Sequence, residues 1–245
     1  ARGGGLNTDP AGPPGAGVVD LGDEDAAFTR GGNRLVFVDP RDAGRCIKVL
    51  RPDRLPGTKR REKGFPKNLK PLSAFDDNLQ EIRVYERILR SLGEQAFDCI
   101  PRIHGLVDTN FGQGLCCDLV RDDDGRISLS LKQYLWQHGR SARLDYTLRR
   151  FSARWCRLGV PSRNLLLHNM VIQCGGPRPQ RLLVIDGLGW PDLLPLAWYW
   201  PALARRKAAR RIGLLYQAVD ALLERRDAEQ DFGFHGWLED GQRRA

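Results

Sequence analysis

The stretch RNLLLHNMVI, residues 163–172, and the stretch RLLVIDG, residues 181–187, decide how this chain is interpreted. Each contains an apolar run, and the turn-forming stretch GGPRPQ lies between them, so the pattern predicts a loop that leads into a strand, a tight turn and a second strand. Asn169 opens the first strand, and Asp186 ends the second directly before a glycine. Mg²⁺ prefers oxygen ligands of these kinds, so both residues are candidates for a metal site.

Both residues also have a simpler interpretation, because Asn and Asp are common in turns. Residues 163–169 nevertheless resemble the catalytic loop of protein kinases, H-R-D-x-x-x-x-N, and Asn169 matches the final Asn of that motif. Asn164 stands where that loop has the Asp that orients the substrate hydroxyl. A neutral amide can orient a hydroxyl but cannot act as a base, and the loss of a general base costs about 10²–10⁴-fold in rate. This departure weakens catalysis without abolishing nucleotide binding.

The length and composition favour a globular protein with one domain of two lobes or two small domains. The chain has 245 residues, of which 41% are hydrophobic. Lys and Arg number 39 against 30 Asp and Glu, and the net charge of +9 favours polyanionic partners such as nucleotides, nucleic acid or acidic membrane surfaces. The longest apolar candidate, residues 193–204, is too short to cross a bilayer, so no transmembrane segment is predicted.

The cysteines and histidines show neither a disulfide framework nor a metal-binding pattern. The six cysteines include no C-x-x-C pair, and four of them lie in apolar runs. We therefore expect buried, reduced thiols and, since no signal peptide is visible, a cytoplasmic protein. The four histidines are too scattered to indicate a metal site.

Four segments follow one another along the chain. Residues 1–19 are rich in Gly, Pro and Ala and are expected to form a disordered leader. Residues 20–125 predict a small N-lobe of strands plus one helix. Residues 126–232 predict a mainly helical C-lobe with two short strands around the candidate metal site, and 233–245 form a tail without a strong pattern. Strands first and helices later are typical of an α+β fold.

The expected N-lobe contains a candidate phosphate-binding lysine. Lys48 lies in the apolar run CIKVL, which forms one strand of a hairpin predicted over 33–50. Burial of an ammonium group is costly unless it meets an anion, so Lys48 is a candidate for the phosphates of a nucleotide, although it could also point to solvent. Gly31 and Gly32 precede the hairpin as neighbours, without the spacing G-x-G-x-x-G, yet adjacent glycines can still offer backbone N–H groups to a phosphate.

A helix predicted over 76–93 offers two carboxylates as partners for Lys48. Glu86 lies within the apolar stripe of this helix by helical angle, and Glu81 lies at the edge of the stripe. Either side chain could face inward, and either could instead be solvated beside partners one helical turn away.

The order of these elements is similar to that of a protein-kinase-like core. In addition, the stretches RCIKVL, NLQEIRVYERIL, IPRIHGLVDTNFGQGLCCDLVRDDDGRISLSLKQYL and LLHNMVIQ resemble the YrbL family of PhoP regulatory network proteins, over about residues 21–225. The resemblance implies a bacterial protein with a protein-kinase-like fold and a link to the regulon of a two-component system. It places the strand lysine at Lys48, the helix glutamate at Glu81, the metal-binding amide at Asn169 and the metal-binding acid at Asp186.

The expected function is that of an atypical kinase-like protein that binds ATP and Mg²⁺ and transfers phosphate to an unknown acceptor. The nucleotide would be held by Gly31, Gly32, Lys48 and Glu81, and the metal by the residues named above. One alternative is a pseudokinase, a regulatory binding module without catalysis. A further alternative is a basic nucleic-acid-binding protein that uses the arginines of 202–213, although a solvated basic helix explains them as well. The sequence leaves the acceptor and the oligomeric state open. The aromatic run at 198–200 is expected in the core, or alternatively as a platform for the acceptor.

Overall fold

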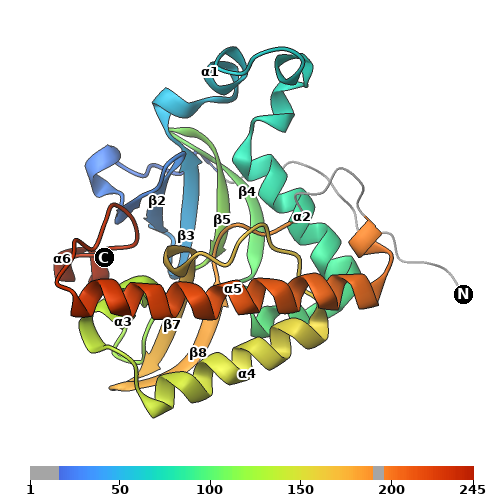
Figure 1. The fold of residues 1–245 in the computed structure, drawn as a ribbon. Coiled ribbons are helices and arrows are strands. Elements are labelled where there is room, and N and C mark those ends of the chain that lie inside the picture. The colour runs from blue at the N-terminus through green and yellow to red at the C-terminus, as the bar shows by residue number, and fades with distance from the viewer. Residues whose placement is uncertain (1–16, 190–195) are drawn as a thin grey trace, which may run out of the picture.

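A five-stranded antiparallel sheet forms the first half of the fold (Figure 1). The structure, a computed structural model, describes residues 17–189 and 196–245. The strands lie in the order β1-β2-β3-β5-β4. They are β1 (Thr29–Arg30), β2 (Arg34–Asp39), β3 (Asp42–Leu50), β4 (Ile103–Thr109) and β5 (Gly112–Asp118). The hairpin expected over 33–50 is therefore present as β2–β3, and β4 and β5 form a second hairpin.

The expected leader overlaps the fold at its last residues. Residues 1–16 lie outside the described part of the chain. Val19 is buried, and its backbone N–H donates to the carbonyl of Asp108 at 2.8 Å. The folded part therefore begins before residue 20.

Alternation of side chains gives the five-stranded sheet two different faces. On one face an apolar core is formed by Val19, Leu21, Leu35, Phe37, Ile47, Val49 and Cys116. The intervening positions point to the opposite face, because successive side chains of a strand alternate. They include Arg34 on β2 and Lys48 on β3, and both side chains are buried. This second face therefore needs carboxylates or other polar partners from outside the sheet.

Helix α2 (Asp77–Leu92) supplies those partners. The helix begins where its capping residue predicts, because the Asp76 carboxylate accepts hydrogen bonds from the backbone N–H groups of Asn78 and Leu79. Asn78, Tyr85 and Ile88 are its buried residues, and their spacing places Glu81 on the same helical face. The inward face of α2 is thus polar at its N-terminal end and apolar further along.

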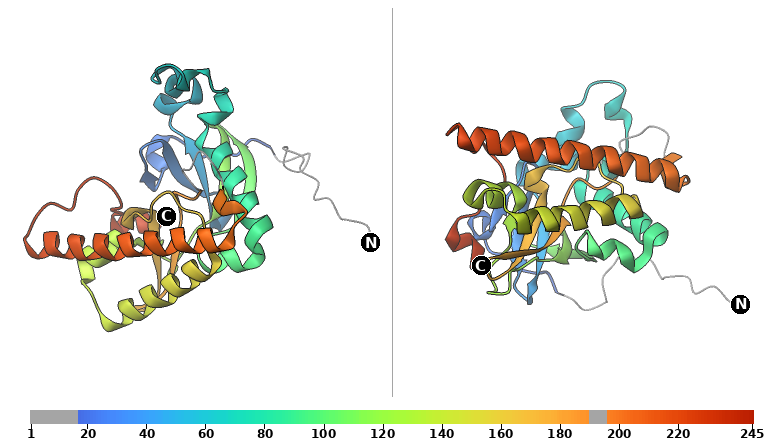
Figure 2. Two further views of the ribbon diagram at one scale, coloured as in Figure 1. Left: turned by 45° about the vertical axis from the view of Figure 1, so that its right-hand side comes forward. Right: turned by 60° about the horizontal axis from the view of Figure 1, so that its bottom comes forward.

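The second half of the fold combines a small sheet with helices. The three-stranded sheet has the order β6-β7-β8, and its strands are β6 (Leu129–Ser130), β7 (Met170–Gly175) and β8 (Arg178–Val184). The helices are α3 (Leu131–His138), α4 (Ala142–Leu158), the long α5 (Pro201–Asp227) and the short α6 (Asp240–Arg243). Helices α4 and α5 lie side by side along one side of the molecule (Figures 1 and 2). Their buried residues join those of β6–β8 and of α2 in one large core.

Shorter elements occupy the connections. Helix α1 (Pro56–Arg61) lies in the basic segment before α2. The 3₁₀ turns are η1 (Glu24–Ala26), η2 (Pro52–Arg54), η3 (Lys67–Leu69), η4 (Leu72–Ala74), η5 (Gly93–Asp98), η6 (Leu167–Asn169) and η7 (Leu196–Trp198).

The residues expected to form a tail pack against the rest of the fold. We call 235–245 the C-terminal segment. The buried Gln133 side chain donates to the carbonyl of Leu238 and accepts from its N–H, both at 2.8 Å. Further along, Arg243 donates to the carbonyl of Ile127 at 3.0 Å and forms an ion pair with Asp122 at 2.8 Å. The segment is thereby attached both to α3 and to the linker 119–128 between the two halves.

The architecture confirms the predicted fold class, an α+β chain with a β-rich first part and a mainly helical second part. Within 17–189 and 196–245, no helix has the length and apolar character needed to cross a membrane.

Candidate functional site

The loop 163–169 and the end of β8 lie side by side between the two halves of the fold. The N–H of Ile185 donates to the carbonyl of Asn169 at 2.9 Å, and the N–H of Arg163 donates to the carbonyl of Gly187 at 2.8 Å. Gly187 has φ +80°, and a Cβ atom there would lie 3.2 Å from the carbonyl oxygen of Asn164. Only glycine combines this backbone conformation with so close an approach. The Asp-Gly step therefore brings Asn164, Asn169 and Asp186 together.

Lys48 connects the five-stranded sheet to this loop region. Its Nζ lies 2.8 Å from Glu81 Oε1 on α2 and donates to the carbonyl oxygen of Ile185, also at 2.8 Å. The lysine thus contacts the residue directly before Asp186. The sequence left Glu81 and Glu86 open as its partner; Glu81 forms the ion pair, and Glu86 is exposed.

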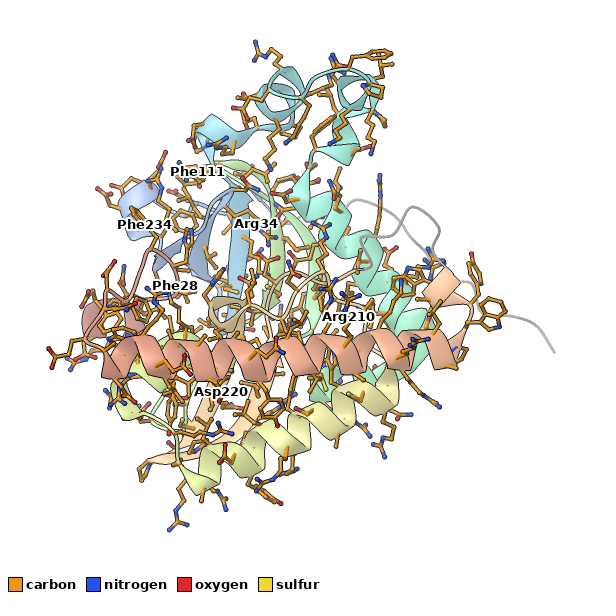
Figure 3. All side chains as sticks on the ribbon, viewed as in Figure 1. Phe28, Arg34, Phe111, Arg210, Asp220 and Phe234 are labelled. Atoms are coloured by element: carbon orange, nitrogen blue, oxygen red, sulfur yellow. The ribbon has the colours of Figure 1, made fainter. Side chains whose placement is uncertain are left out.

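Arg34, which sequence reasoning missed, forms a second bridge across the same space. Its guanidinium contacts the carboxylate of Glu81 through one NH2 group and lies 2.9 Å from Asp186 Oδ2 through the other. The Arg34 side chain is 9% exposed, and Figure 3 labels it between the strands and α2. Two cations and two carboxylates therefore form one continuous network.

The charges in this network stabilise one another. Burial by itself lowers the pKa of Lys48, but the charges of Glu81, Cys117 and Asp186 together outweigh it and raise that pKa above its ordinary value. Burial would likewise raise the pKa of Asp186, but Arg34, Lys48 and a hydrogen bond from the Gly187 N–H lower it to about 2. At neutral pH both groups are consequently charged.

Two adjoining cavities lie at the network. The first, which we call the charged cleft, has a volume of about 460 Å³, and its lining includes every residue predicted for the site: Gly31, Gly32, Lys48, Glu81, Asn164, Asn169 and Asp186. The second, which we call the apolar slot, has a volume of about 120 Å³, and its mainly apolar lining includes Phe28, Val36, Cys46, Cys117, Leu119, Val171 and Ile185. Lys48, His168 and Gly236 line both cavities, so the slot opens beside the charged groups.

The remaining predicted residues lie at the edges of the charged cleft. Gly31 and Gly32 form the turn between β1 and β2, and neither requires positive φ. Their lack of side chains leaves the backbone open to close approach by a ligand. Asn164 is exposed, and its amide oxygen accepts a hydrogen bond from Arg211 of α5 at 3.1 Å. The position of the kinase catalytic Asp is thus held by a neutral amide turned toward an arginine.

The donors expected for a metal fit a hard cation by chemistry. Asn169 and Asp186 offer an amide and a carboxylate at one cavity, and Mg²⁺ commonly uses one or two carboxylates plus the oxygens of bound phosphates. Asp186 is half exposed to the cleft, yet both its oxygens have partners, Arg34 and the Gly187 N–H at 2.6 Å. In the part of the chain that the structure describes, no group of three or more His, Cys, Asp or Glu side chains could hold a metal ion.

The C-terminal segment also forms part of the cavities. Gly236, Trp237 and Leu238 line the apolar slot, and His235 lies against His168 with ring centroids 5.5 Å apart. Sequence reasoning missed this contribution, because nothing local in a short stretch rich in glycine and aromatic residues indicates a partner about 100 residues away. A signal for Arg34 was available, since it begins the apolar run RLVFV directly after the glycine turn.

The arginines considered for nucleic acid lie on α5, away from the slot. Two of them have partners within the protein: Arg205 donates to the carbonyl of Arg157 at 3.1 Å, and Arg211 donates to Asn164. Nucleic-acid binding stays an untested alternative.

Known proteins resemble this chain in sequence and in structure. The family model of PhoP regulatory network protein YrbL matches residues 19–219. Proteins named uncharacterized protein YrbL from Escherichia coli (strain K12) and from Shigella flexneri are each 26% identical over 195 residues, which cover 76% of this chain and 81% of the relative. A solved structure of Rad53 1–466 in complex with AMP-PNP is similar with a TM-score of 0.47 and 12% identity, over 84% of this chain and 52% of that one.

The family match extends over both halves of the fold and includes the whole ion network. It begins at Val19, the first buried residue of the described chain, and ends within α5. The resemblance expected from the sequence is therefore confirmed, and the chain belongs to the family of the PhoP regulatory network protein YrbL.

Proposed function

We propose that the cleft between the two halves binds ATP, with the base in the apolar slot and the phosphates in the charged cleft. The observation that carries the proposal is the Lys48–Glu81 ion pair, formed beside Asp186 and next to an apolar cavity. In protein kinases a strand lysine paired with a helix glutamate holds the phosphates, and an Asp at a strand end holds the metal. The same three chemical groups meet here from β3, α2 and the end of β8.

The proposed roles follow from charge and position. Lys48 is fixed by Glu81 and presents its ammonium to the phosphates, and the Gly31–Gly32 turn lets the backbone approach them. Asn169 and Asp186 would hold Mg²⁺ once Asp186 is free of Arg34. The ion would supply neutralisation of phosphate charge. The apolar lining of the slot suits the flat, largely apolar face of a purine.

Phosphoryl transfer is a second candidate function, supported by the place of Asn164. This residue lines the charged cleft beside Gly187, where an acceptor hydroxyl would approach the terminal phosphate. In the transfer, an acceptor oxygen–phosphorus bond forms, the bond from the γ-phosphorus to the bridging oxygen breaks, and the hydroxyl proton leaves to solvent. Positioning and charge stabilisation supply most of the acceleration in such reactions, so a slow transfer without a base is feasible.

The binding proposal is tested by thermal unfolding of the intact chain with ATP and Mg²⁺. A ligand present at about 100 times its Kd adds about 2.7 kcal/mol, so the Tm of the wild-type protein should rise by about 5 °C or more. Lys48→Met should lose most of this rise. Lys70→Met is the control, because Lys70 is exposed and does not line either cavity. An ATP-induced rise that is equal in the wild-type protein, Lys48→Met and the control variant would refute the site.

Transfer is tested separately by release of phosphate from ATP. If Asn164 occupies the position of the base, Asn164→Asp should raise the rate by up to about 10²–10⁴-fold. Unchanged, negligible turnover in a variant that still binds ATP would favour a regulatory module without catalysis.

A further inference from the structure

Arg34 occupies a place in the cleft that the kinase pattern leaves empty. The glycine-rich loop of kinases reads G-x-G-x-x-G-x-V, and when its valine is set on Val36 the last glycine falls on Arg34. Here this position carries a long cation instead of no side chain. The β2–β3 register places Val36 opposite Lys48, so the Arg34 side chain lies on the same face of the sheet as the lysine.

The guanidinium of Arg34 lies where a metal ion would need to bind Asp186. One NH2 group lies 2.9 Å from Asp186 Oδ2, and the other contacts Glu81. The amide oxygen of Asn78 also lies 3.4 Å from the guanidinium, so the side chain is held from three directions. A metal ion bound to Oδ2 at about 2.0–2.1 Å would lie close to the guanidinium, and the two positive charges would repel each other. The other oxygen of Asp186 already accepts the Gly187 N–H.

We propose that Arg34 competes with divalent metal for Asp186, so that the native cleft binds nucleotide with little dependence on Mg²⁺. The inference rests on the proposed function. Arg34 is a cation covalently tied to the cleft, and a guanidinium hydrogen-bonds phosphate oxygens strongly. Arg34 and Lys48 both line the charged cleft, so two cations already balance the carboxylates of Glu81 and Asp186 before any metal arrives. Asn169 alone would then offer too few protein ligands for a tight metal site.

The test compares the Kd of ATP in EDTA with its Kd in excess Mg²⁺, by calorimetry on the full chain. For the wild-type protein the two Kd values should agree within about threefold. A metal ion bound through Asp186 would instead make them differ by about tenfold or more, which is the contribution of one charge-assisted interaction. In Arg34→Gln, ATP should bind at least about tenfold more tightly with Mg²⁺ than without it. Arg163→Gln is the matched control, because Arg163 lines the same cleft and is exposed, and its side chain donates to Gln80 and not to Asp186. Arg163→Gln should raise the Kd of ATP by the same factor in EDTA and in Mg²⁺.

A second measurement keeps the inference separate from ATP binding itself. Mn²⁺ without nucleotide, followed by the electron paramagnetic resonance signal of the free ion, should bind Arg34→Gln at least about tenfold more tightly than the wild-type protein. The gain should disappear in the Arg34→Gln/Asp186→Asn double variant. If Arg34→Gln does not fold, Arg34→Lys, which keeps the charge but not the fork of donors, should show a smaller shift in the same direction.

The outcomes separate the two proposals. Equal Mn²⁺ affinity in wild type and variant, or wild-type ATP binding that vanishes in EDTA, would overturn the role of Arg34. Failure of ATP to bind any of the proteins, together with the expected Mn²⁺ gain, would refute nucleotide binding but leave the competition at Asp186 established.

Discussion

The charged cleft and the apolar slot adjoin each other but are built in different ways. In the charged cleft, side chains from β2, β3, α2 and the end of β8 hold one another through ion pairs. In the slot, the linker 119–128 and the C-terminal segment form walls that are attached mainly through hydrogen bonds between side chains and backbone groups. The first is therefore sensitive to the loss of a single charge, and the second to the loss of a packing or hydrogen-bonding partner.

The largest loss of stability is expected in the charged cleft, from replacement of Glu81. Its replacement by Ala leaves both Lys48 and Arg34 without their shared carboxylate in a buried place, and breaking such a network costs about 3–5 kcal/mol. Glu86→Ala on the exposed face of the same helix should change stability by less than about 0.5 kcal/mol. Urea unfolding of both variants measures the contrast. Equal, small losses would show that the cations of the cleft do not depend on Glu81.

An intermediate effect is expected at the slot. Gln133→Ala removes both hydrogen bonds to Leu238 and should cost about 1–3 kcal/mol, because backbone groups are left without partners. Gln137→Ala, at an exposed position of the same helix, is the control. Hydrogen exchange should show faster exchange at 236–238 in Gln133→Ala alone. If those amides stay as protected as in the wild type, Gln133 does not hold residues 236–238 against α3.

The smallest effect concerns Asp186 and pH. Its pKa is lowered to about 2 in the folded chain, against about 3.9 for an unfolded Asp, so its ionised form stabilises the fold above that unfolded value. The contribution is lost as pH falls toward 2. The stability difference between wild type and Asp186→Asn should therefore shrink between about pH 5 and pH 2, by no more than about 1–2 kcal/mol for a half-exposed carboxylate. A difference that stays constant over this range would show that the carboxylate charge contributes nothing.

The sequence predicted those parts of the fold that local patterns determine. The period of two in LVFV and CIKVL, the turns between strands and the caps of α2 each act within a few residues. The residues of the charged cleft were selected in the same way, because a lysine in an apolar strand and an Asp at a strand end stand out chemically. The structure brings them to one cavity, while their binding roles remain proposals.

Other features depend on contacts distant in sequence. The apolar stripe suggested that Glu86 faces inward, whereas the buried face of α2 is shifted toward Asn78 and Glu81, because that face meets the cations of the sheet. The aromatic run at 198–200 was expected mainly in the core; Trp198 packs against it, but Tyr199 and Trp200 are 75% and 64% exposed. Trp198 and Tyr199 also contact the guanidinium of Arg87 of α2 through their ring faces. Such pairings are specified by tertiary packing and leave no periodic trace.

The place of Gly236–Leu238 in the slot has a consequence for synthesis of the protein. A ribosome releases a chain from its N-terminus, and the sheets, α2 and the Asp186 loop all precede this stretch. The four charged residues of the ion network are therefore synthesised before Gly236–Leu238, which form one wall of the apolar slot. During translation the nascent protein would pass through a stage in which the ion network is assembled but the slot still stands open to the surrounding solution.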